Sequence, residues 1–350
     1  MGLLFRAFRS AETRYHELSY LFWECTTRCN LHCRHCGSDC MAASDDVDMP
    51  LKDFLGALDS IPVKERPREF TVVLTGGEPL LRPDIAEVGQ SLRDRGVAWG
   101  MVTNGYFYDE KMHGILTGAG MRVLTISLDG LESDHDWMRG RAGSFERAKR
   151  AIALAASDPR LNFDVVTCVN RRNIKDLQAI HDLLSGLGVK QWRIFTIIPI
   201  GRAKDDPDLH LTDAEFVSLM DFIRSKREHR ESPMNVTFSC EGYLGRYERK
   251  VRQSPYFCRA GINIASILID GRICGCPNID RDVFSQGNIY EGDILWDVWR
   301  TRFGVFRDRS WARKGRCKDC PVFRDCLGNG MHNWHGDCSE VLNCHWAKTL

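Results

Sequence analysis

The sequence predicts an α/β fold built on a parallel sheet and followed by a cysteine-rich C-terminal module. Three observations support this: six short apolar runs alternate with helix-like segments over residues 19–200, shorter β-like pieces follow residue 250, and cysteines cluster at both ends. Alternating strands and helices indicate βαβ units, whose functional residues gather at the carboxyl ends of the strands. Six such units form either an open doubly wound sheet or a partial barrel, and periodicity alone does not distinguish them.

The expected elements follow in chain order. The six strands are Tyr20–Glu24, Phe70–Leu74, Ala98–Val102, Val123–Ser127, Phe163–Cys168 and Gln191–Ile197. Apolar residues at steps of three and four predict helices at 51–61, 83–95, 108–118, 144–156 and 173–187. Another helix is expected over 212–228, because Thr212 and Glu215 have the spacing of a capping box. A hairpin is expected near the C-terminus, with strands Ile264–Ile269 and Arg272–Cys274 joined at Asp270-Gly271.

Length and charge restrict the classes of protein. The 350 residues carry 48 basic and 47 acidic side chains, without a basic stripe, so no nucleic-acid partner is expected. The longest apolar runs span about five to eight residues, short of the roughly 18 that a membrane span needs, and no secretory signal is evident, so a cytoplasmic protein is expected. The expected division is an N-terminal extension at 1–17, a core at 18–205, a linker and helix at 206–250 and a cysteine-rich domain at 251–350.

Fifteen cysteines in a cytoplasmic chain indicate metal or redox ligands rather than disulfide bonds. The most informative group is Cys29-Asn-Leu-His-Cys33-Arg-His-Cys36, which directly follows the first expected strand. Three thiolates on a short loop can ligate three irons of a 4Fe–4S cluster and leave the fourth iron open. An open coordination position is typical of a catalytic metal centre. Cys25 and Cys40 flank this group and are interpreted as buried structural thiols.

Small or polar residues end the next three strands: Gly76-Gly77-Glu78-Pro79, Thr103-Asn104-Gly105 and Ser127-Leu128-Asp129-Gly130. Glycines let a backbone approach a ligand closely, and a carboxylate accepts hydrogen bonds from an amine. The side chains of Ser127 and Asp129 point the same way from an extended segment and could hold two ribose hydroxyls. Each motif taken alone is equally consistent with an ordinary turn.

Taken together with the cysteine motif, these turns resemble the radical S-adenosylmethionine (radical SAM) superfamily over residues 18–205. The resemblance implies a partial (β/α)6 barrel in which SAM chelates the open iron. It also implies that reductive cleavage of SAM yields a 5′-deoxyadenosyl radical that abstracts hydrogen from the substrate. Arg139 resembles the arginine that contacts the methionine carboxylate. The implied cofactor-binding residues are Gly76, Gly77, Glu78, Pro79, Asn104, Ser127, Asp129, Arg139 and Asn170.

The C-terminal cysteines are similar to the SPASM extension of radical SAM enzymes, which carries up to two auxiliary 4Fe–4S clusters. The resemblance assigns one cluster to Cys317, Cys320, Cys326 and Cys344. The other would use Cys258 and Cys276, with help from Cys338 and from either Cys240 or Cys274. The chain departs from the SPASM pattern at Gly330, where a cysteine is expected. A zinc site formed by Cys317, Cys320, Cys326 and Cys338 is the alternative from spacing alone.

SPASM proteins most often modify peptides, so the expected substrate is a peptide or protein side chain. It would bind directly or through a separate recognition protein, with electrons from a flavodoxin- or ferredoxin-type reductant. Sulfatase maturases place aspartate where this chain has Pro277, which argues against that activity. Residues 24–40 also resemble an uncharacterised SPASM subgroup linked to lipoproteins. The alternatives are a small-molecule substrate such as a porphyrin or sugar, and a non-catalytic iron–sulfur or zinc protein.

Overall fold

The structure, a computed structural model, describes residues 2–41, 47–229, 233–239 and 241–350. Its strands form one ten-stranded sheet in the order β10-β9-β8-β1-β2-β3-β4-β5-β6-β7. The barrel strands are β1 (Tyr20–Thr26), β2 (Thr71–Gly76), β3 (Ala98–Thr103), β4 (Met121–Ser127), β5 (Asn162–Val169), β6 (Gln191–Thr196) and β7 (Asn235–Phe238). The six strands expected from the sequence are confirmed, and β7 adds a strand that the sequence analysis did not predict.

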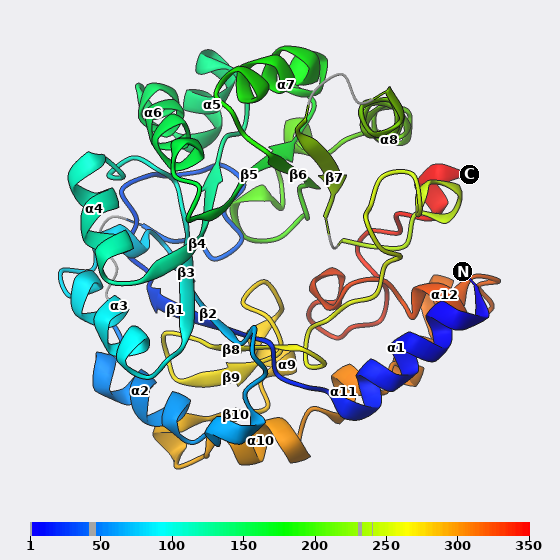
Figure 1. The fold of residues 1–350 in the computed structure, drawn as a ribbon. Coiled ribbons are helices and arrows are strands. Elements are labelled where there is room, and N and C mark those ends of the chain that lie inside the picture. Colours follow the sequence, from blue (N-terminus) through cyan, green and yellow to red (C-terminus); the bar gives the residue numbers. More distant parts are fainter. Residues whose placement is uncertain (1, 42–46, 230–232, 240) are drawn as a thin grey trace.

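The strand order decides between the two predicted architectures. Strands β1 to β7 are neighbours in chain order, and every adjacent pair is parallel. A doubly wound sheet reverses its strand order at a switch point, whereas a barrel adds each new strand on the same side. The sheet is therefore a partial barrel, with its strands around an arc and helices outside them (Figure 1).

The outer helices are α2 (Leu51–Asp59), α3 (Ile85–Asp94), α4 (Glu110–Gly118), α5 (Glu132–Arg139), α6 (Ser144–Ser157), α7 (Leu177–Gly186) and α8 (Asp213–His229). All except α5 were expected. The capping box of α8 is present, because the Glu215 backbone N–H donates to Thr212 Oγ1 at 3.2 Å and the Thr212 N–H donates to the Glu215 carboxylate at 2.8 Å. Such a box satisfies two backbone donors at the start of the helix.

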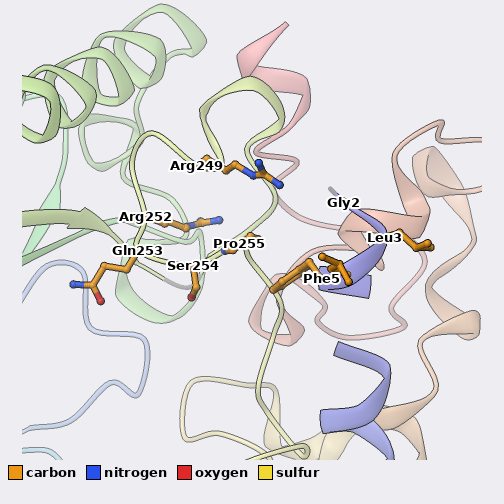
Figure 2. A pocket seen from close by; sticks show the side chains of 9 residues that line it. Gly2, Leu3, Phe5, Arg249, Arg252, Gln253, Ser254 and Pro255 are labelled. Carbon is orange, nitrogen blue, oxygen red and sulfur yellow. The ribbon is translucent and has the colours of Figure 1, made fainter. Parts of the chain in front are cut away.

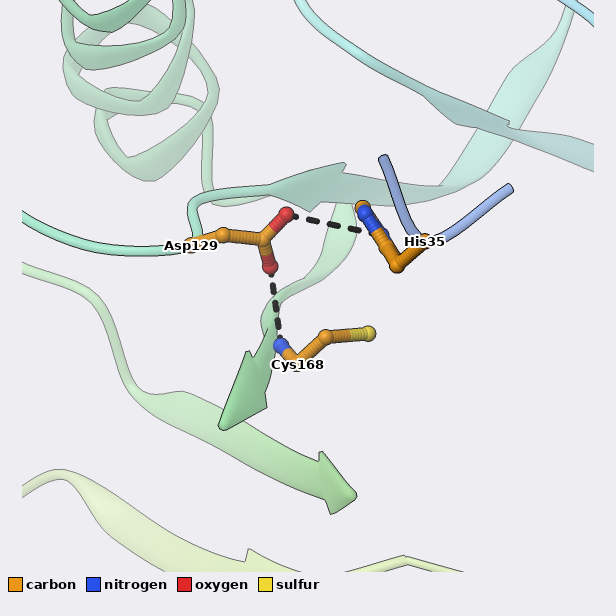
Figure 3. A group of neighbouring side chains, drawn as sticks. All are labelled: His35, Asp129 and Cys168. Carbon is orange, nitrogen blue, oxygen red and sulfur yellow. Dashed lines mark hydrogen bonds and ion pairs between the residues drawn. The ribbon is translucent and has the colours of Figure 1, made fainter. Parts of the chain in front are cut away.

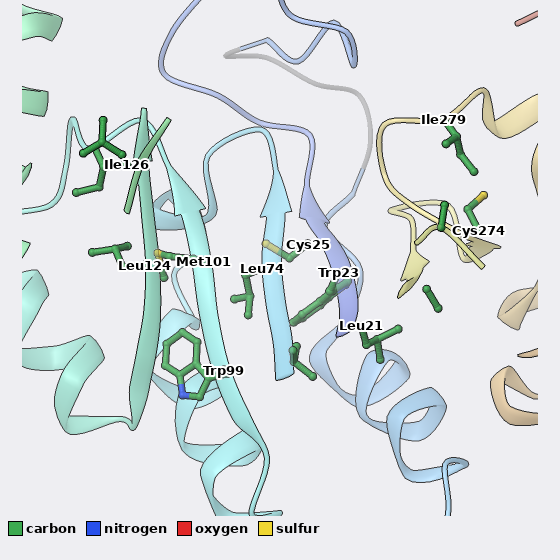
Figure 4. Close-up of a cluster of buried hydrophobic side chains, with 14 of the residues drawn as sticks. Leu21, Trp23, Cys25, Leu74, Trp99, Met101, Leu124, Ile126, Cys274 and Ile279 are labelled. Atoms are coloured by element: carbon green, nitrogen blue, oxygen red, sulfur yellow. The ribbon is translucent and has the colours of Figure 1, made fainter. Parts of the chain in front are cut away.

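The main core lies between the strands and the outer helices (Figure 4). Strand β1 contributes Trp23, whose ring stacks on Phe54 of α2 with centroids 4.1 Å apart. Strand β3 contributes Trp99, which is fully buried and donates its indole N–H to the Ala119 carbonyl at 3.2 Å. A parallel sheet covered by helices needs such continuous apolar runs, which explains why periodicity identified the strands.

The cysteine-rich region joins the same sheet. Strand β8 (Ile264–Ile267) pairs in parallel with β1, and β9 (Arg272–Cys274) and β10 (Gly287–Asn288) follow it antiparallel. The predicted hairpin is confirmed, with Gly271 at its turn in the left-handed region at φ 83°. The buried carboxylate of Glu24 also links the two regions, because it pairs with Arg281 at 2.9 Å and accepts the Ile269 N–H.

The remaining helices are α1 (Leu3–Tyr15), α9 (Arg281–Phe284), α10 (Leu295–Thr301), α11 (Gly304–Arg307) and α12 (Phe323–Cys326). The C-terminal segment lies on the open side of the arc between α8 and α1 (Figure 1). The Arg6 guanidinium of α1 binds the Asp325 carboxylate of α12 at 2.7 Å, and Phe5 packs edge-on against Phe257. None of the described helices has both the length and the apolar character needed to cross a membrane.

Candidate functional site

Residues 28–41, here called the cluster loop, follow β1 and carry the C-x3-C-x2-C motif. Cys29 and Cys33 are buried and Cys36 is half-buried. Burial raises the pKa of Cys29 to about 11, whereas a hydrogen bond from the Cys40 thiol lowers the pKa of Cys36 to about 6. Cys40 packs beside the other three thiols, and Cys25 is fully buried in the main core. The three motif cysteines therefore lie close together on one loop, as ligands of a single cluster must.

The turn after β2 holds the start of the cluster loop. The Gly77 N–H donates to the Thr26 carbonyl at 2.7 Å, and the Glu78 N–H donates to the Arg28 carbonyl at 2.9 Å. A Cβ atom on Gly76 would stand 2.2 Å from the Thr26 oxygen, and one on Gly77 would stand 2.1 Å from the Arg28 oxygen. Both glycines are required because the loop backbone occupies the space of a side chain.

Glu78 connects the ends of β2 and β3 beneath the loop. Its carboxylate is fully buried and accepts hydrogen bonds from Thr103 Oγ1 at 2.7 Å, the Asn104 N–H at 2.8 Å and the Leu80 N–H at 3.2 Å. Burial raises the pKa of Glu78, and these donors oppose that rise. Asn104 in turn donates its side-chain amide to Asn30 of the loop at 2.9 Å. Pro79, also buried, opens the short 3-10 turn that follows.

Asp129 and Arg139 form a buried ion pair beside the loop. Their closest nitrogen and oxygen atoms are 2.6 Å apart, and Arg139 also donates to Cys33 Sγ at 3.7 Å. His35 of the loop stands 3.6 Å from the same carboxylate, which accepts the Cys168 backbone N–H at 2.8 Å (Figure 3). Burial acts to raise the pKa of Asp129, but the Arg139 guanidinium holds it below its ordinary value.

Several buried polar atoms here have no hydrogen-bond partner within the described residues: Arg139 Nε, His35 Nδ1 and Asp129 Oδ2, the last of which has only its ion pairs. Buried polar atoms are nearly always satisfied in proteins, by water or ligands if not by the chain. These atoms therefore fit a polar, charged ligand bound at the cluster loop, such as the amino-acid part of SAM. Burial lowers the pKa of His35 to about 4, so its ring is neutral.

Two other predicted cofactor contacts occupy different surroundings. Ser127 is half-buried at the end of β4. Asn170 is buried after β5, where its side-chain oxygen accepts the backbone N–H groups of Arg172 at 2.8 Å and Asn173 at 3.3 Å. The Asn170 side chain therefore closes its own turn, and its predicted contact with SAM stays a prediction.

Two further turns contact the cluster loop. Arg202, after β6, donates its Nε to the Cys33 carbonyl at 2.7 Å, and its backbone N–H donates to the Cys36 carbonyl at 3.1 Å. Gly140, after α5, has φ 67°, and a Cβ there would stand 2.5 Å from the His32 carbonyl oxygen. The loop is thus fixed from β1, β2, α5 and β6, which gives the three thiols a defined geometry.

A second thiol group surrounds a cavity of about 270 Å³ in the C-terminal region. This four-thiol cavity is lined by Cys317, Cys320, Cys326 and Cys344, the four cysteines predicted to share a cluster. Burial and the neighbouring thiols raise the pKa of Cys317 to about 11 and that of Cys326 to about 12. The Asn329 N–H also donates to Cys326 Sγ at 3.2 Å.

The spacing of these thiols does not suit one zinc ion. Four sulfurs bound tetrahedrally at about 2.3 Å from zinc lie about 3.8 Å apart. Within the described chain, the only group of three ligand atoms that all lie within 4.8 Å of one another is His35, Asp129 and Cys168. No three thiols among Cys317, Cys320, Cys326 and Cys344, or in the alternative zinc set with Cys338 in place of Cys344, therefore lie as close together as ligands of one tetrahedral zinc ion.

The remaining predicted cysteine ligands do not line the four-thiol cavity. Cys258 and Cys276 are half-buried against the main core. Cys274 is fully buried in β9, where burial raises its pKa to about 12. Cys338 is buried near Lys314 and Asp280 and is not among the residues that line the four-thiol cavity. Cys240 lies outside the described residues, so a first auxiliary cluster stays a prediction.

A buried network that sequence reasoning missed joins the barrel to this region. The Glu241 carboxylate accepts hydrogen bonds from the backbone and hydroxyl of Thr196, at the end of β6, and lies 3.0 Å from His345 Nε2. The Glu241 carbonyl accepts the Gly330 N–H, and a Cβ on Gly330 would stand 2.5 Å from the His332 ring. A side chain at position 330 would have to displace the His332 ring, so the present packing suits the glycine that stands where the SPASM pattern has cysteine.

Another cavity lies away from both thiol groups. It measures about 540 Å³ and lies between residues 2–5 and 249–255 (Figure 2). Its lining contains no cysteine and includes the exposed Leu3 and Leu4 of α1. It contributes nothing to either thiol group.

Two family models match the chain, the first over the cluster loop and the second over Cys317 and Cys320 of the four-thiol cavity. The model of the radical SAM superfamily matches residues 23–184, and that of the SPASM iron–sulfur cluster-binding domain matches residues 258–321. The chain is 30% identical to the mycofactocin maturase MftC of Mycobacterium tuberculosis over 89% of its length and 78% of that protein. It is 25% identical to an AdoMet-dependent heme synthase of Nitratidesulfovibrio vulgaris over 90% of its length and 88% of that protein.

The fold has a solved counterpart. SuiB of Streptococcus suis, in its structure bound to the precursor peptide SuiA, superposes with a TM-score of 0.71 over 96% of this chain and 78% of that one. The two sequences are 16% identical, so this likeness concerns the fold.

Proposed function

The chain belongs to the radical SAM superfamily and is an S-adenosylmethionine-dependent iron–sulfur enzyme, and we propose that it acts as a maturase on a peptide or protein side chain. Its cofactors are SAM, the 4Fe–4S cluster that binds SAM, and auxiliary 4Fe–4S clusters. Together they supply a 5′-deoxyadenosyl radical that removes hydrogen from an unactivated C–H bond.

One observation carries the assignment of the reaction centre. The three thiols of the cluster loop lie beside a buried ion pair, Asp129–Arg139, in which Arg139 also donates to Cys33 Sγ and its Nε has no hydrogen-bond partner in the described chain. In this proposal Cys29, Cys33 and Cys36 ligate the cluster, and Arg139 holds the methionine carboxylate. Gly76 and Gly77 keep the loop against β2, while Glu78 fixes the Asn104 turn that borders the cofactor. The surrounding strands exclude water from the reacting atoms.

Polar side chains inside the barrel favour a polar substrate. Asp164 of β5 bridges the Thr125 hydroxyl of β4, at 2.6 Å, and the Arg193 guanidinium of β6. The Arg193 side chain is 40% exposed, so it could meet a peptide carbonyl or carboxylate. Strand alternation puts Asp164 on the same face of β5 as Cys168, whose thiol lies within 4.8 Å of the His35 and Asp129 ligand atoms.

The relatives support two substrate classes. MftC is named a maturase, and SuiB has been solved with a precursor peptide. Both favour a peptide substrate, delivered directly or by a separate recognition protein in the cytoplasm. The second candidate is a tetrapyrrole, because the similarity to the AdoMet-dependent heme synthase extends over 90% of the chain.

The proposal is tested by anaerobic reconstitution with iron and sulfide, followed by addition of SAM and dithionite. We expect the wild type to form 5′-deoxyadenosine and the Cys29/Cys33/Cys36→Ala variant to form none, while that variant keeps its auxiliary iron. Absence of product from fully iron-loaded wild type, with and without added substrates, would contradict the proposed reaction.

The substrate class is tested with two additions in parallel: a peptide digest of the host proteome and coproporphyrin III. A maturase forms 5′-deoxyadenosine faster with the digest, and tandem mass spectrometry finds a peptide that has lost or exchanged hydrogen. Faster formation with coproporphyrin alone would replace the peptide by the tetrapyrrole.

A further inference from the structure

An exposed patch beside the cluster loop combines aromatic rings with unpaired positive charge. Tyr106, in the turn after β3, packs against the cluster loop beside Cys36 and the buried Cys29 and Cys33. Its ring lies 5.2 Å from that of Phe107, which is 41% exposed. Tyr106 therefore contacts the thiol group on one side and lies next to an exposed aromatic residue on the other.

Two arginines cover the Tyr106 ring. The Arg141 guanidinium lies 4.1 Å and that of Arg147 lies 5.4 Å from the ring centroid. Arg141 also donates to the Asn30 carbonyl of the cluster loop at 2.9 Å. Both arginines are exposed, and neither has a carboxylate within ion-pair distance in the part of the chain that the structure describes.

Unpaired charge distinguishes these arginines from the others around the loop. Arg139 is paired with Asp129, Arg202 with Asp39, and Arg172 with Asp134. Nearby on α6, Lys149 and Glu146 neutralise each other at 2.5 Å. At the start of α4, the Asp109 carboxylate accepts the Met112 N–H and caps the helix.

We propose that Tyr106, Phe107, Arg141 and Arg147, here called the Tyr106 surface, dock an acidic one-electron carrier protein. This inference rests on the proposed function, because it assigns where the electron for SAM cleavage enters. The carrier is oxidised by one electron and the cluster held by the cluster loop is reduced by one, with no proton transferred.

Three features of the Tyr106 surface fit such a carrier. Its apolar centre matches the exposed edge of a redox group, and its unpaired guanidiniums match a surrounding ring of carboxylates. Encounters between electron-transfer proteins bury little area and depend on charge steering for their rate. Tyr106 packs against the group formed by Leu31 and the cluster-loop cysteines, so the surface lies next to the cluster.

The test uses an acidic flavodoxin, reduced enzymatically, as the electron donor to the reconstituted holoenzyme. Stopped-flow bleaching of the cluster is followed at low ionic strength in wild type and in R141E/R147E. We expect the cluster of R141E/R147E to be reduced at least about tenfold more slowly than that of wild type, because electrostatic steering changes association rates by about 10- to 1,000-fold. The rate in R141K/R147K should stay near that of wild type.

The matched control, R313E/K318E, reverses the charge of two exposed cations near the four-thiol cavity. Like Arg141, Arg313 lies over an aromatic ring, because its guanidinium is 4.9 Å from the centroid of Phe323. The proposal predicts that R313E/K318E is reduced at the wild-type rate. It is overturned if R141E/R147E is reduced as fast as wild type, or if R313E/K318E is slowed as much. Dithionite separates this failure from failure of the proposed function, because it needs no docking and should support wild-type 5′-deoxyadenosine formation in R313E/K318E. The reduction rate of R141E/R147E with flavodoxin is compared with its own rate with dithionite, which corrects for the lost contact of Arg141 with the cluster loop.

Discussion

The cluster loop and the four-thiol cavity offer iron two different environments. The loop supplies three thiols beside buried polar atoms that lack partners, including Arg139 Nε. The cavity supplies four thiols, and its lining mixes apolar side chains such as Phe323 and Val341 with Arg316 and Glu340. A cluster with three protein ligands can take a charged ligand at its fourth iron. A cluster with four protein ligands is complete and is suited to carrying electrons.

The largest effect should distinguish the cysteines of the cavity from a nearby cysteine outside it. Cys344→Ser removes one of four ligands, so we expect the variant to lose about four irons per chain. Cys338→Ser removes a thiol that does not line the cavity and should keep those irons. Iron analysis and absorption spectra of the two reconstituted variants check this. Loss of the same irons from both would place Cys338 in the cluster and refute the four-ligand set.

A second variant tests the buried ion pair beside the cluster loop. Arg139→Gln leaves the Asp129 carboxylate buried without its guanidinium, a change that typically costs about 3–5 kcal/mol of stability. The variant should also bind SAM weakly. Denaturant unfolding and SAM binding measure the two effects.

Its control is Lys149→Gln, which breaks a solvent-exposed pair with Glu146 and should cost less than about 1 kcal/mol. Equal destabilisation by the two substitutions would show that the buried pair has no special role.

The smallest effect concerns how the loop is held. Gly77→Ala puts a Cβ against the Arg28 carbonyl, and such overpacking costs about 1–3 kcal/mol. The displaced loop should lose its iron while the four-thiol cavity keeps its own. Gly114→Ala in α4 is the control, since no atom lies within 4 Å of the added Cβ and helix propensity favours alanine by about 0.5–1 kcal/mol. Iron retained by the loop in Gly77→Ala would mean that the β2 turn does not position it.

The sequence predicted most of the barrel because parallel strands buried under helices have continuous apolar runs. It did not predict β7 (Asn235–Phe238), which is four residues long, or α5, whose segment is mostly polar. The barrel itself followed from the family resemblance and is confirmed by the strand order. Pairing of β8 with β1 depends on contacts between residues more than 240 positions apart, which no local pattern encodes.

The candidate site was predictable to the extent that spacing defines it. The C-x3-C-x2-C motif located the loop, and the cysteines assigned to one auxiliary cluster line a single cavity. Spacing could not show that Asp129 pairs with Arg139 or that His35 and Cys168 lie beside them. It also gave no sign that Glu241 reaches Thr196 and His345, since these contacts arise only when the chain closes.

Electron paramagnetic resonance of the reduced holoenzyme, recorded with and without SAM, tests the central difference between the two thiol groups most directly. The spectra are compared between wild type and the Cys29/Cys33/Cys36→Ala variant. The account predicts that SAM alters the signal that the variant lacks and leaves the signal of the four-thiol cavity unchanged, because the proposal has SAM bind the open iron of the loop cluster. A wild-type spectrum that does not respond to SAM, or the same response in the variant, would contradict it.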